Sequence, residues 1–337
     1  MVLLHINNRK QNFSTGACTG MNHRKQTRRI LRLLFFFALL TLAVTGAGAV
    51  YVKPSPTPVP EWGLPLEDGY PAVIDRFHDP EAYPDFTFAD DAELLEIIFP
   101  NVRDCDSTVI RTGNEVWMID SADKGAMAGR VIDTLKKFQI DKIDTLIITH
   151  PHHDHMNGLK EINDAVPVGR MLICFPEDCT QHIINAAALC AERGIPIEHY
   201  DHGDTFNIGN ASIEVWRQYE EKWTINNQSA IYRLTCGERS MLFLADAEDK
   251  QQRLLADTAA PEWLDCDIMR YPHHGKTAMV EKLYTAINPY FVTVTNHARG
   301  GEAWYYLGCK HVPTAYTVSA YIRLTTDGKH WIAEQVQ

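Results

Sequence analysis

The sequence predicts a layered α/β fold with mixed sheets, and two observations support this prediction. From about residue 91 onward, short apolar or alternating segments interleave with segments whose apolar residues recur at helical spacing. Several strand candidates follow one another across tight turns, whereas Thr145–Thr149 is apolar enough to be buried on both faces of a sheet. Hairpins and doubly buried strands together indicate both antiparallel and parallel pairing.

Residues 1–32 form a basic tail that contains seven Lys or Arg residues and no Asp or Glu. Residues 33–52 follow without a charge, and a helix of this length spans about 30 Å, the hydrocarbon thickness of a bilayer. Basic residues before an apolar segment favour a cytoplasmic N-terminus. We therefore expect one transmembrane helix that anchors an extracytoplasmic domain to the cell membrane. The alternatives are a signal peptide cleaved near Ala47-Gly48-Ala49, followed by secretion, and a buried core helix.

Residues 53–90 are predicted to be a linker and an irregular lead-in. Prolines alternate with other residues over Lys53–Pro60, which favours an extended and semi-rigid spacer. Residues 66–90 are rich in Asp, Pro and aromatic residues and show no periodicity. The globular domain is then expected over residues 91–337.

The elements of this domain are predicted from periodicity and turn residues. Lys124–Phe138, for example, is predicted to be helical because its apolar residues can share one face. In the first half we expect strands at Leu94–Phe99, Thr108–Arg111, Glu115–Ile119 and Thr145–Thr149, and helices at Lys124–Phe138 and Asp178–Arg193. In the second half we expect strands at Ala211–Trp216, Ala230–Thr235, Met241–Ala245, Ile268–Tyr271 and Tyr290–Thr295, a helix near Lys250–Asp257, and a final hairpin of Ala320–Leu324 and His330–Gln335.

The charge distribution limits the partners of this domain. Beyond residue 32 the chain carries 25 basic and 43 acidic residues, so its overall field does not attract polyanions. A nucleic-acid substrate is therefore not supported by the net charge and would need metal ions or a local basic patch. The eight cysteines lack paired spacing, although Cys174 and Cys179 are close enough in sequence to pair or to remain buried thiols.

The strongest chemical signal is the segment from His150 to His155, which reads His-Pro-His-His-Asp-His directly after the apolar strand at Thr145–Thr149. Imidazoles and a carboxylate suit zinc, iron or manganese, and a strand end can aim them at a common point. His150 and His152 can reach one metal, while Asp154 and His155 can turn to a second. The alternative is a polar loop with coincidental histidines.

This motif closely resembles the signature of the metallo-β-lactamase-fold superfamily. The order of further segments is similar to the hydrolase domain of ComEC-type competence proteins, over about residues 92–337. These segments are Arg103–Ser107, Met118–Ser121, Asn226–Ser229, Leu242–Asp246 and Arg270–Gly275. The resemblance implies an αββα sandwich and a hydrolase with two divalent metal ions, zinc first and manganese or iron as alternatives.

Carried across residue by residue, the resemblance gives His150 and His152 to the first metal and Asp154 and His155 to the second. Asp246 would bridge both metals. One of His273 and His274 would complete the second site, and we expect His274 because it directly precedes a glycine. His273 would then lie behind the ligands or contact the leaving group, so that Asp154 and His273 are the predicted catalytic residues.

Two departures from the superfamily pattern stand out. Many members supply a third histidine to the first metal from a segment that here reads Asn226–Ser229, so the first site is expected to be weaker, or completed by water or substrate. The turn at Asp104–Ser107 also lacks the glycines of its ComEC-type counterpart, although Asp tolerates turn conformations. The resemblance implies that a water bridging metals about 3.5–4 Å apart is deprotonated near neutral pH and attacks phosphorus or a carbonyl carbon.

Five further residues are candidates for contacting an anionic substrate, small or polymeric: Asn227, Ser229, Lys276, Asn296 and His297. The alternative is that they belong to solvated polar loops. Three function classes stay open, namely phosphoester hydrolysis, amide or ester hydrolysis of the β-lactamase type, and a surface binding module on the same fold. The absent third histidine counts against a typical β-lactamase, and the full set of ligands counts against a binding module.

Overall fold

The computed structural model describes residues 76–78, 87–296, 301–310, 312, 314–317 and 320–336 of the chain. These residues belong to one compact unit, Pro54–Gln337. The predicted tail and anchor, residues 1–52, lie outside the described residues. Within the described part of the chain, no helix has both the length and the apolar character that crossing a bilayer requires.

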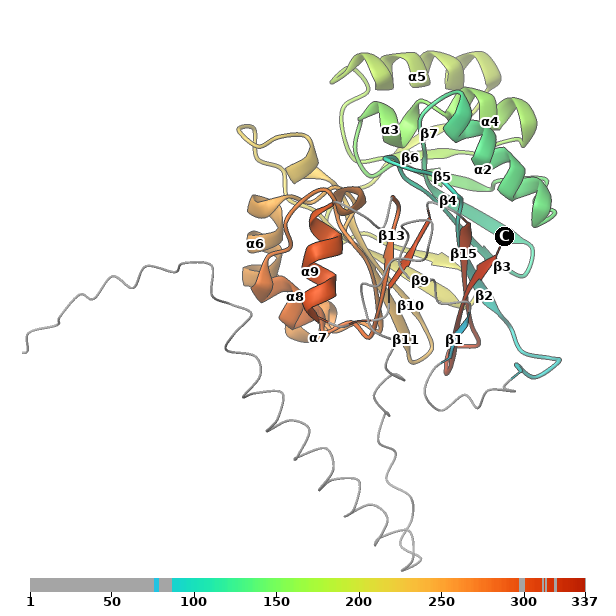
Figure 1. Cartoon of the computed structure of the whole chain (residues 1–337). Helices are drawn as coiled ribbons and strands as arrows, with labels where there is room; N and C mark the ends of the chain where they lie inside the picture. The colour runs from blue at the N-terminus through green and yellow to red at the C-terminus, as the bar shows by residue number, and fades with distance from the viewer. Residues whose placement is uncertain are drawn as a thin grey trace, which may run out of the picture. The chain divides into compact units, whose positions relative to one another are not determined.

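Two mixed β-sheets form the centre of the unit (Figure 1). Among the described residues the first sheet has nine strands, in the order β1-β16-β15-β2-β3-β4-β5-β6-β7, and the second has seven, in the order β14-β13-β12-β11-β10-β9-β8. The strands of the first sheet are β1 (Arg76–His78), β2 (Leu95–Phe99), β3 (Ser107–Thr112), β4 (Glu115–Ser121), β5 (Thr145–Ile147), β6 (Met171–Ile173), β7 (Ile197–His199), β15 (Tyr321–Thr326) and β16 (Trp331–Val336). The strands of the second sheet are β8 (Thr205–Ile208), β9 (Ala211–Trp216), β10 (Ile231–Cys236), β11 (Arg239–Phe243), β12 (Ile268–Arg270), β13 (Phe291–Val294) and β14 (Thr314–Tyr316).

Helices cover the two sheets from outside (Figure 1). The group α2 to α5 lies over the first sheet near β4–β7, and the group α6 to α9 lies over the second. The helices are α2 (Ala126–Lys137), α3 (His153–Met156), α4 (Leu159–Ala165), α5 (Gln181–Arg193), α6 (Asp249–Thr258), α7 (Pro261–Leu264), α8 (Glu281–Ile287) and α9 (Glu302–Lys310), with 3₁₀ turns η1 (Asn226–Gln228) and η2 (His273–Gly275).

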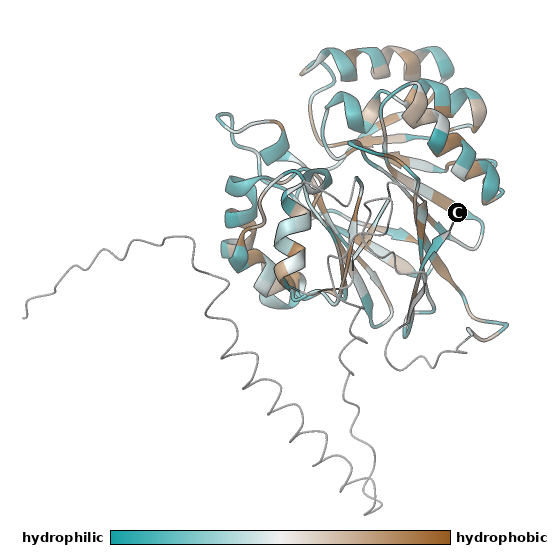
Figure 2. Cartoon of the chain, in the orientation of Figure 1, coloured by the Kyte–Doolittle hydropathy of each residue, from teal (hydrophilic) through white to brown (hydrophobic). Residues whose placement is uncertain are grey.

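The side chains of β11 show how the layers are held together. Met241 and Phe243 belong to the core that is shared with the first sheet, while Leu242 and Leu244, the residue that follows the strand, belong to the core beneath the second group of helices. This alternation buries both faces of the second sheet. The order of layers is therefore helix, sheet, sheet, helix, and Figure 2 shows apolar strands inside and polar outer faces on the helices.

The α/β fold with mixed sheets predicted from the sequence is confirmed. β3 and β4 pair antiparallel, as the predicted hairpin requires, and β4, β5 and β6 pair parallel, as a strand buried on both faces requires. The helix predicted from Asp178 begins at Gln181, because Thr180 caps it by accepting a hydrogen bond from the Ile183 N–H group. It ends at Arg193, before Gly194 in the left-handed conformation.

One expectation needs correction, and one open alternative is decided. Part of the predicted irregular lead-in, Arg76–His78, is strand β1, which pairs antiparallel with β16 some 250 residues along the chain. A local sequence pattern does not reveal a strand partner that lies so far along the chain. Cys174 and Cys179 are both reduced thiols, so the pairing considered from the sequence does not form.

Candidate metal centre

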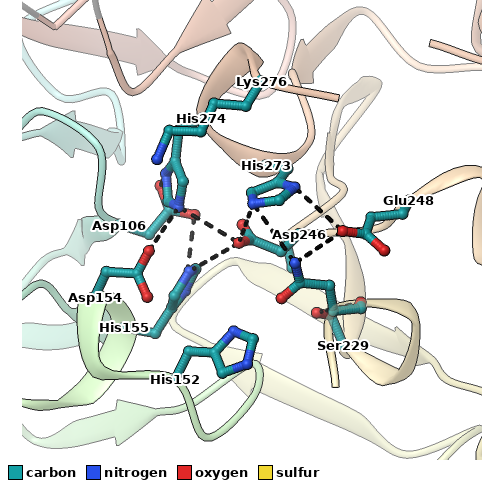
Figure 3. A network of polar contacts seen from close by, with 12 residues as sticks. Asp106, His152, Asp154, His155, Ser229, Asp246, Glu248, His273, His274 and Lys276 are labelled. Carbon is teal, nitrogen blue, oxygen red and sulfur yellow. Dashed lines mark hydrogen bonds and ion pairs between the residues drawn. The ribbon is translucent and has the colours of Figure 1, made fainter. Parts of the chain in front are cut away.

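The predicted ligands come from loops that follow parallel strands. His150 and His152 follow β5, Asp246 follows β11, and His273 and His274 lie on η2 after β12. Strands β11 and β12 pair parallel, so their carboxyl ends lie at the same edge of the second sheet. Figure 3 shows that these loops meet those of the first sheet, which brings residues about 120 positions apart into one cluster.

The Asp246 carboxylate lies at the centre of the cluster. Its Oδ2 atom is 3.3 Å from Nε2 of His155 and 3.4 Å from Nε2 of His274. The same oxygen is 3.6 Å from Nε2 of His273 and 3.8 Å from Nε2 of His150. A single carboxylate that faces several imidazole nitrogens is placed to be shared between two cations.

The structure brings all six predicted metal ligands together. One ligand atom from each of Asp154, His155, Asp246 and His274 lies within 4.8 Å of every other in this group. On the other side, Nε2 of His150 is 3.1 Å from Nδ1 of His152. The cluster thus divides into two groups of ligands with Asp246 common to both.

Unpartnered atoms test whether this cluster fits metal ions. Nε2 of His155, Nε2 of His274 and Oδ1 of Asp246 are buried and lack a hydrogen-bond partner among the described residues. Leaving such groups unsatisfied costs about 1–3 kcal/mol each, and more when charged. Imidazole and carboxylate donors around one point suit divalent metals, so the residues present fit the ions that the sequence predicted.

Two further carboxylates, those of Asp120 and Asp106, orient ligand imidazoles. Nδ1 of His155 is 2.8 Å from Oδ2 of Asp120, which also accepts a hydrogen bond from the Thr149 hydroxyl. Nδ1 of His274 lies 3.6 Å from Oδ1 of Asp106. A carboxylate on the far nitrogen of a ligand imidazole fixes its tautomer and turns its lone pair to the metal.

The comparisons with known proteins identify the family. Residues 100–283 match the family model of the metallo-beta-lactamase superfamily, and this match covers more than half of the chain. The chain belongs to that superfamily. It is accordingly an enzyme with the superfamily's metal-dependent hydrolase fold, which confirms the superfamily and the enzyme class expected from the sequence.

Several solved structures are similar to this chain at low sequence identity. The metallo-beta-lactamase fold protein YhfI from Bacillus subtilis is 11% identical, with 66% of this chain and 95% of that chain covered and a TM-score of 0.46. CmlA, a diiron beta-hydroxylase from Streptomyces venezuelae, is 18% identical, with 65% and 47% covered and a TM-score of 0.41. The metallo-beta-lactamase MIM-1 from Novosphingobium pentaromativorans is 15% identical, with 52% and 76% covered and a TM-score of 0.37. A search of curated proteins gave no match.

The electrostatics of this superfamily member favour cations at the centre. Burial lowers the pKa of an imidazole, but at His155 and His274 the adjacent carboxylates outweigh burial and raise both pKa values well above normal. The carboxylate common to both is Asp246. Burial lowers the pKa of His150 and of His152. Divalent cations would supply positive charge beside the Asp246 carboxylate, and the imidazoles that bind them would be neutral.

Backbone strain is concentrated around the cluster. Non-glycine residues with positive φ include Asp120 (57°), Ala245 (44°), His273 (50°) and His274 (50°). Such conformations cost about 1–3 kcal/mol each and persist where the surrounding structure enforces them. At Asp120, His273 and His274 this backbone conformation directs the side chain toward the cluster. At Ala245 it turns the chain directly before Asp246.

Sequence reasoning gave no role to the residues behind the ligands. Asp106 is buried in an ion pair with the Arg270 guanidinium and accepts a hydrogen bond from the Thr295 hydroxyl at 2.6 Å. Glu248 accepts hydrogen bonds from the side-chain amides of Asn226 and Asn227. The sequence offered only their positions as a signal, because Asp106 directly precedes β3 and Asp120 lies near the end of β4. An isolated carboxylate at a strand end resembles any turn residue.

The structure revises part of the predicted substrate contacts. Asn227 is buried and binds Thr224 and Glu248 through its side-chain amide, and the buried Ser229 hydroxyl donates to the backbone oxygen of Asn226. These two side chains hold the η1 loop and would have to break those bonds to reach a substrate. These hydrogen bonds form because a short 3₁₀ turn leaves backbone polar groups without partners, and nearby Asn and Ser side chains can bond to them.

The other candidates lie at the rim. Lys276 is 43% exposed, and its ammonium is 3.2 Å from Oδ1 of Asp104, which also accepts a hydrogen bond from Asn296. Figure 3 shows the Lys276 side chain beside His274. His297 lies outside the described residues.

A cavity of about 1110 Å³ lies away from this chemistry. It lies at the turn between β3 and β4 and the start of β5, whereas the metal cluster lies at the opposite ends of these strands. Charged residues of its lining pair with each other, as in Arg111 with Glu96 and Lys142 with Asp144. The arrangement of ligands, and not cavity size, therefore locates the functional site.

Proposed function

We propose that this hydrolase cleaves phosphoester bonds, phosphodiesters first, and that it belongs to the ComEC-like branch of its superfamily. The observation that carries the proposal is the Asp246 carboxylate, which stands between two groups of nitrogen and oxygen ligands. Two divalent cations held there would provide a hydroxide at neutral pH and neutralise charge on the substrate's oxygens. Such paired sites suit the in-line displacement of a phosphoester.

The rim of the site supports an anionic substrate of limited size. The Lys276 ammonium lies at the edge of the cluster, where it is 3.2 Å from the Asp104 carboxylate. The remainder of the chain beyond residue 32 is strongly acidic, so attraction is local and not spread over the surface. A single phosphoester group fits this distribution better than a long polyanion does.

Asp154 and His155, which lie in α3 beside the first sheet, belong to the second group of ligands. Oδ2 of Asp154 lies 3.4 Å from Nε2 of His274. The His274 imidazole and neighbouring groups outweigh burial and hold the pKa of Asp154 well below normal, so the carboxylate stays charged in the working range of pH. Its loss removes a ligand and a negative charge from the centre.

The test uses the full-length protein, purified in mild detergent and loaded with zinc or manganese. It is assayed on bis-p-nitrophenyl phosphate, p-nitrophenyl phosphate and nitrocefin. We expect turnover of the diester, loss of turnover on chelation, and a fall of at least ~100-fold in Asp154→Ala. His153→Ala is the matched control, because His153 is an exposed histidine beside Asp154 in α3 and contacts Asp123. Equal turnover by Asp154→Ala and the parent protein would end the proposal, and cleavage of nitrocefin alone would replace it with the β-lactamase alternative.

We also propose that residues 33–52 anchor this domain to the cell membrane with the site outside the cytoplasm. The uncharged run of residues 33–52 and the basic tail before it support this topology. The full-length chain should stay with membranes after a high-salt carbonate wash, and a chain that lacks residues 1–52 should not. Recovery of a soluble protein whose N-terminus lies just beyond Ala49 would instead establish cleavage and secretion.

A further inference from the structure

We propose that His273 is the third imidazole ligand of the first metal, oriented by Glu248, in place of the histidine that the superfamily supplies from another segment. The first ligand group otherwise consists of His150, His152 and the shared Asp246. The inference rests on the metal centre of the proposed function but not on its substrate.

The position of the His273 ring matches that of the other ligands. Two ligands about 2.0–2.1 Å from a tetrahedral zinc ion lie about 3.3 Å apart. Nε2 of His273 is 3.6 Å from Oδ2 of Asp246, between the values of 3.4 Å for His274 and 3.8 Å for His150. A carboxylate oxygen and an imidazole nitrogen at this separation can share one cation.

The second nitrogen of the His273 ring, Nδ1, faces a carboxylate, as Nδ1 of the ligand His274 does. Nδ1 of His273 lies 3.6 Å from Oε1 of Glu248, the separation that joins His274 to Asp106. Glu248 is itself held by the amide of Asn226 at 3.0 Å. A carboxylate on Nδ1 keeps the proton there and leaves the lone pair of Nε2 facing Asp246.

His273 lies where the first metal needs a ligand. The second group is already supplied with Asp154, His155, Asp246 and His274, whose ligand atoms form one cluster. Figure 3 shows His273 on the Glu248 side of the Asp246 carboxylate, with Asp154 and His274 on the opposite side. The side-chain amide of Asn226 donates a long hydrogen bond of 3.5 Å to Nε2 of His273, and this nitrogen would exchange that bond for a metal ion. The imidazole thus joins the first ligand group from η2.

The backbone of η2 makes this double use of adjacent histidines possible. His273 and His274 both have φ of 50°, a conformation that costs a non-glycine residue about 1–3 kcal/mol. The two rings are 5.8 Å apart and inclined by 69°, so they face different parts of the cluster. A regular helical turn would not divide neighbouring side chains between two sites in this way.

Metal counting tests the assignment without a substrate. Full-length His273→Ala and His273→Asp are equilibrated with buffered zinc or cobalt, and bound metal is measured by mass spectrometry. We expect His273→Ala to keep one tightly bound ion and to bind the other at least ~100-fold more weakly. The visible spectrum of the cobalt form should change, because a nitrogen ligand is lost. His273→Asp should recover much of the affinity since a carboxylate can coordinate, and imidazole added to His273→Ala should do the same.

The controls separate a ligand from a residue that only supports one. His152→Ala should reproduce the loss in His273→Ala, whereas His153→Ala should bind two ions as the parent protein does. Two ions bound with parental affinity and an unchanged cobalt spectrum in His273→Ala would overturn the assignment. Failure of His273→Asp and of added imidazole to restore binding in a folded variant would also overturn it. Absence of phosphodiesterase activity, by contrast, would refute the proposed substrate and leave the metal count intact.

Discussion

At the scale of single residues, the ion pair of Arg270 and Asp106 supports the metal centre from behind. Both side chains are almost completely buried, and Arg270 also donates to the backbone oxygen of Ala245 and to Thr295. Burial raises the pKa of a carboxyl group, but the Arg270 and His274 charges outweigh burial and hold the pKa of Asp106 well below normal. Asp106 in turn faces His274, so the pair connects the core to a ligand.

Removing one partner of this pair should be costly. We expect Arg270→Met to lower the free energy of unfolding by about 3–5 kcal/mol, because a charged Asp106 is then buried without its partner. The double variant Arg270→Met with Asp106→Leu should recover part of this loss. Urea denaturation of the metal-free proteins measures all three. A single variant as stable as the parent protein would show that the pair does not hold the fold.

The same scale shows what the sequence can and cannot predict about the site. His150, His152, Asp154 and His155 were found because four ligands occur within six positions after a buried strand. Asp246 and His274 were found only through a family resemblance. Asp120 and Glu248 received no role, since a lone carboxylate acquires one only from the imidazole that the fold places beside it.

At the scale of elements, the Asp144 side chain reinforces the backbone pairing between β4 and the start of β5. Oδ2 of Asp144 accepts a hydrogen bond from the Val116 N–H group at 2.8 Å, and its other oxygen is 2.8 Å from the Lys142 ammonium. Burial raises the pKa of the Asp144 carboxyl, but these two donors outweigh burial and place it below its ordinary value. Strand β5 leads directly into the histidine loop, so this contact helps to fix the origin of the loop.

The Asp144 contact predicts a pH-dependent contribution to stability. A carboxyl whose pKa is lowered in the folded state contributes stability above its unfolded pKa of about 3.9, and this stability is lost as pH falls through the lower folded pKa. Asp144→Asn should therefore be less stable than the parent protein at pH 7, by about 1 kcal/mol. The difference should shrink below pH ~4. Lys142→Met should show the same pH window, and a difference that persists unchanged to pH 2 would contradict the assignment.

The elements also differ in how well the sequence predicts them. Helices α2 and α5 were predicted because they are long enough to show a helical period. Strands β6 and β7 have three residues each and were missed, because their parallel pairing with β5 and with each other is not encoded in local alternation. The expected order of layers nevertheless held, since it depends on the longer elements.

At the scale of the whole molecule, the metal centre joins the two sheets. Asp154 and His155 belong to α3 beside the first sheet, whereas Asp246 and His274 follow strands of the second. Cations that bind both sets contact both halves of the sandwich. The free energy of metal binding is then also free energy that holds the halves together, because the unfolded chain does not present the site.

Removing the metals should therefore lower the thermal stability of the whole domain. A metal present at 100 times its dissociation constant stabilises the folded state by about 2.7 kcal/mol per site. For a domain of this size that corresponds to a fall in Tm of roughly 5–10 °C per site after chelation. Calorimetry of the zinc-loaded and metal-free full-length protein measures the fall. Asp246→Asn should have nearly the same Tm with and without zinc, because it lacks the carboxylate common to both ligand groups. His153→Ala should keep the parental difference. If chelation left the parental Tm unchanged while the ions were removed, the two sheets would not be joined through the metals, and the cluster would be a site that the folded sandwich forms without their help.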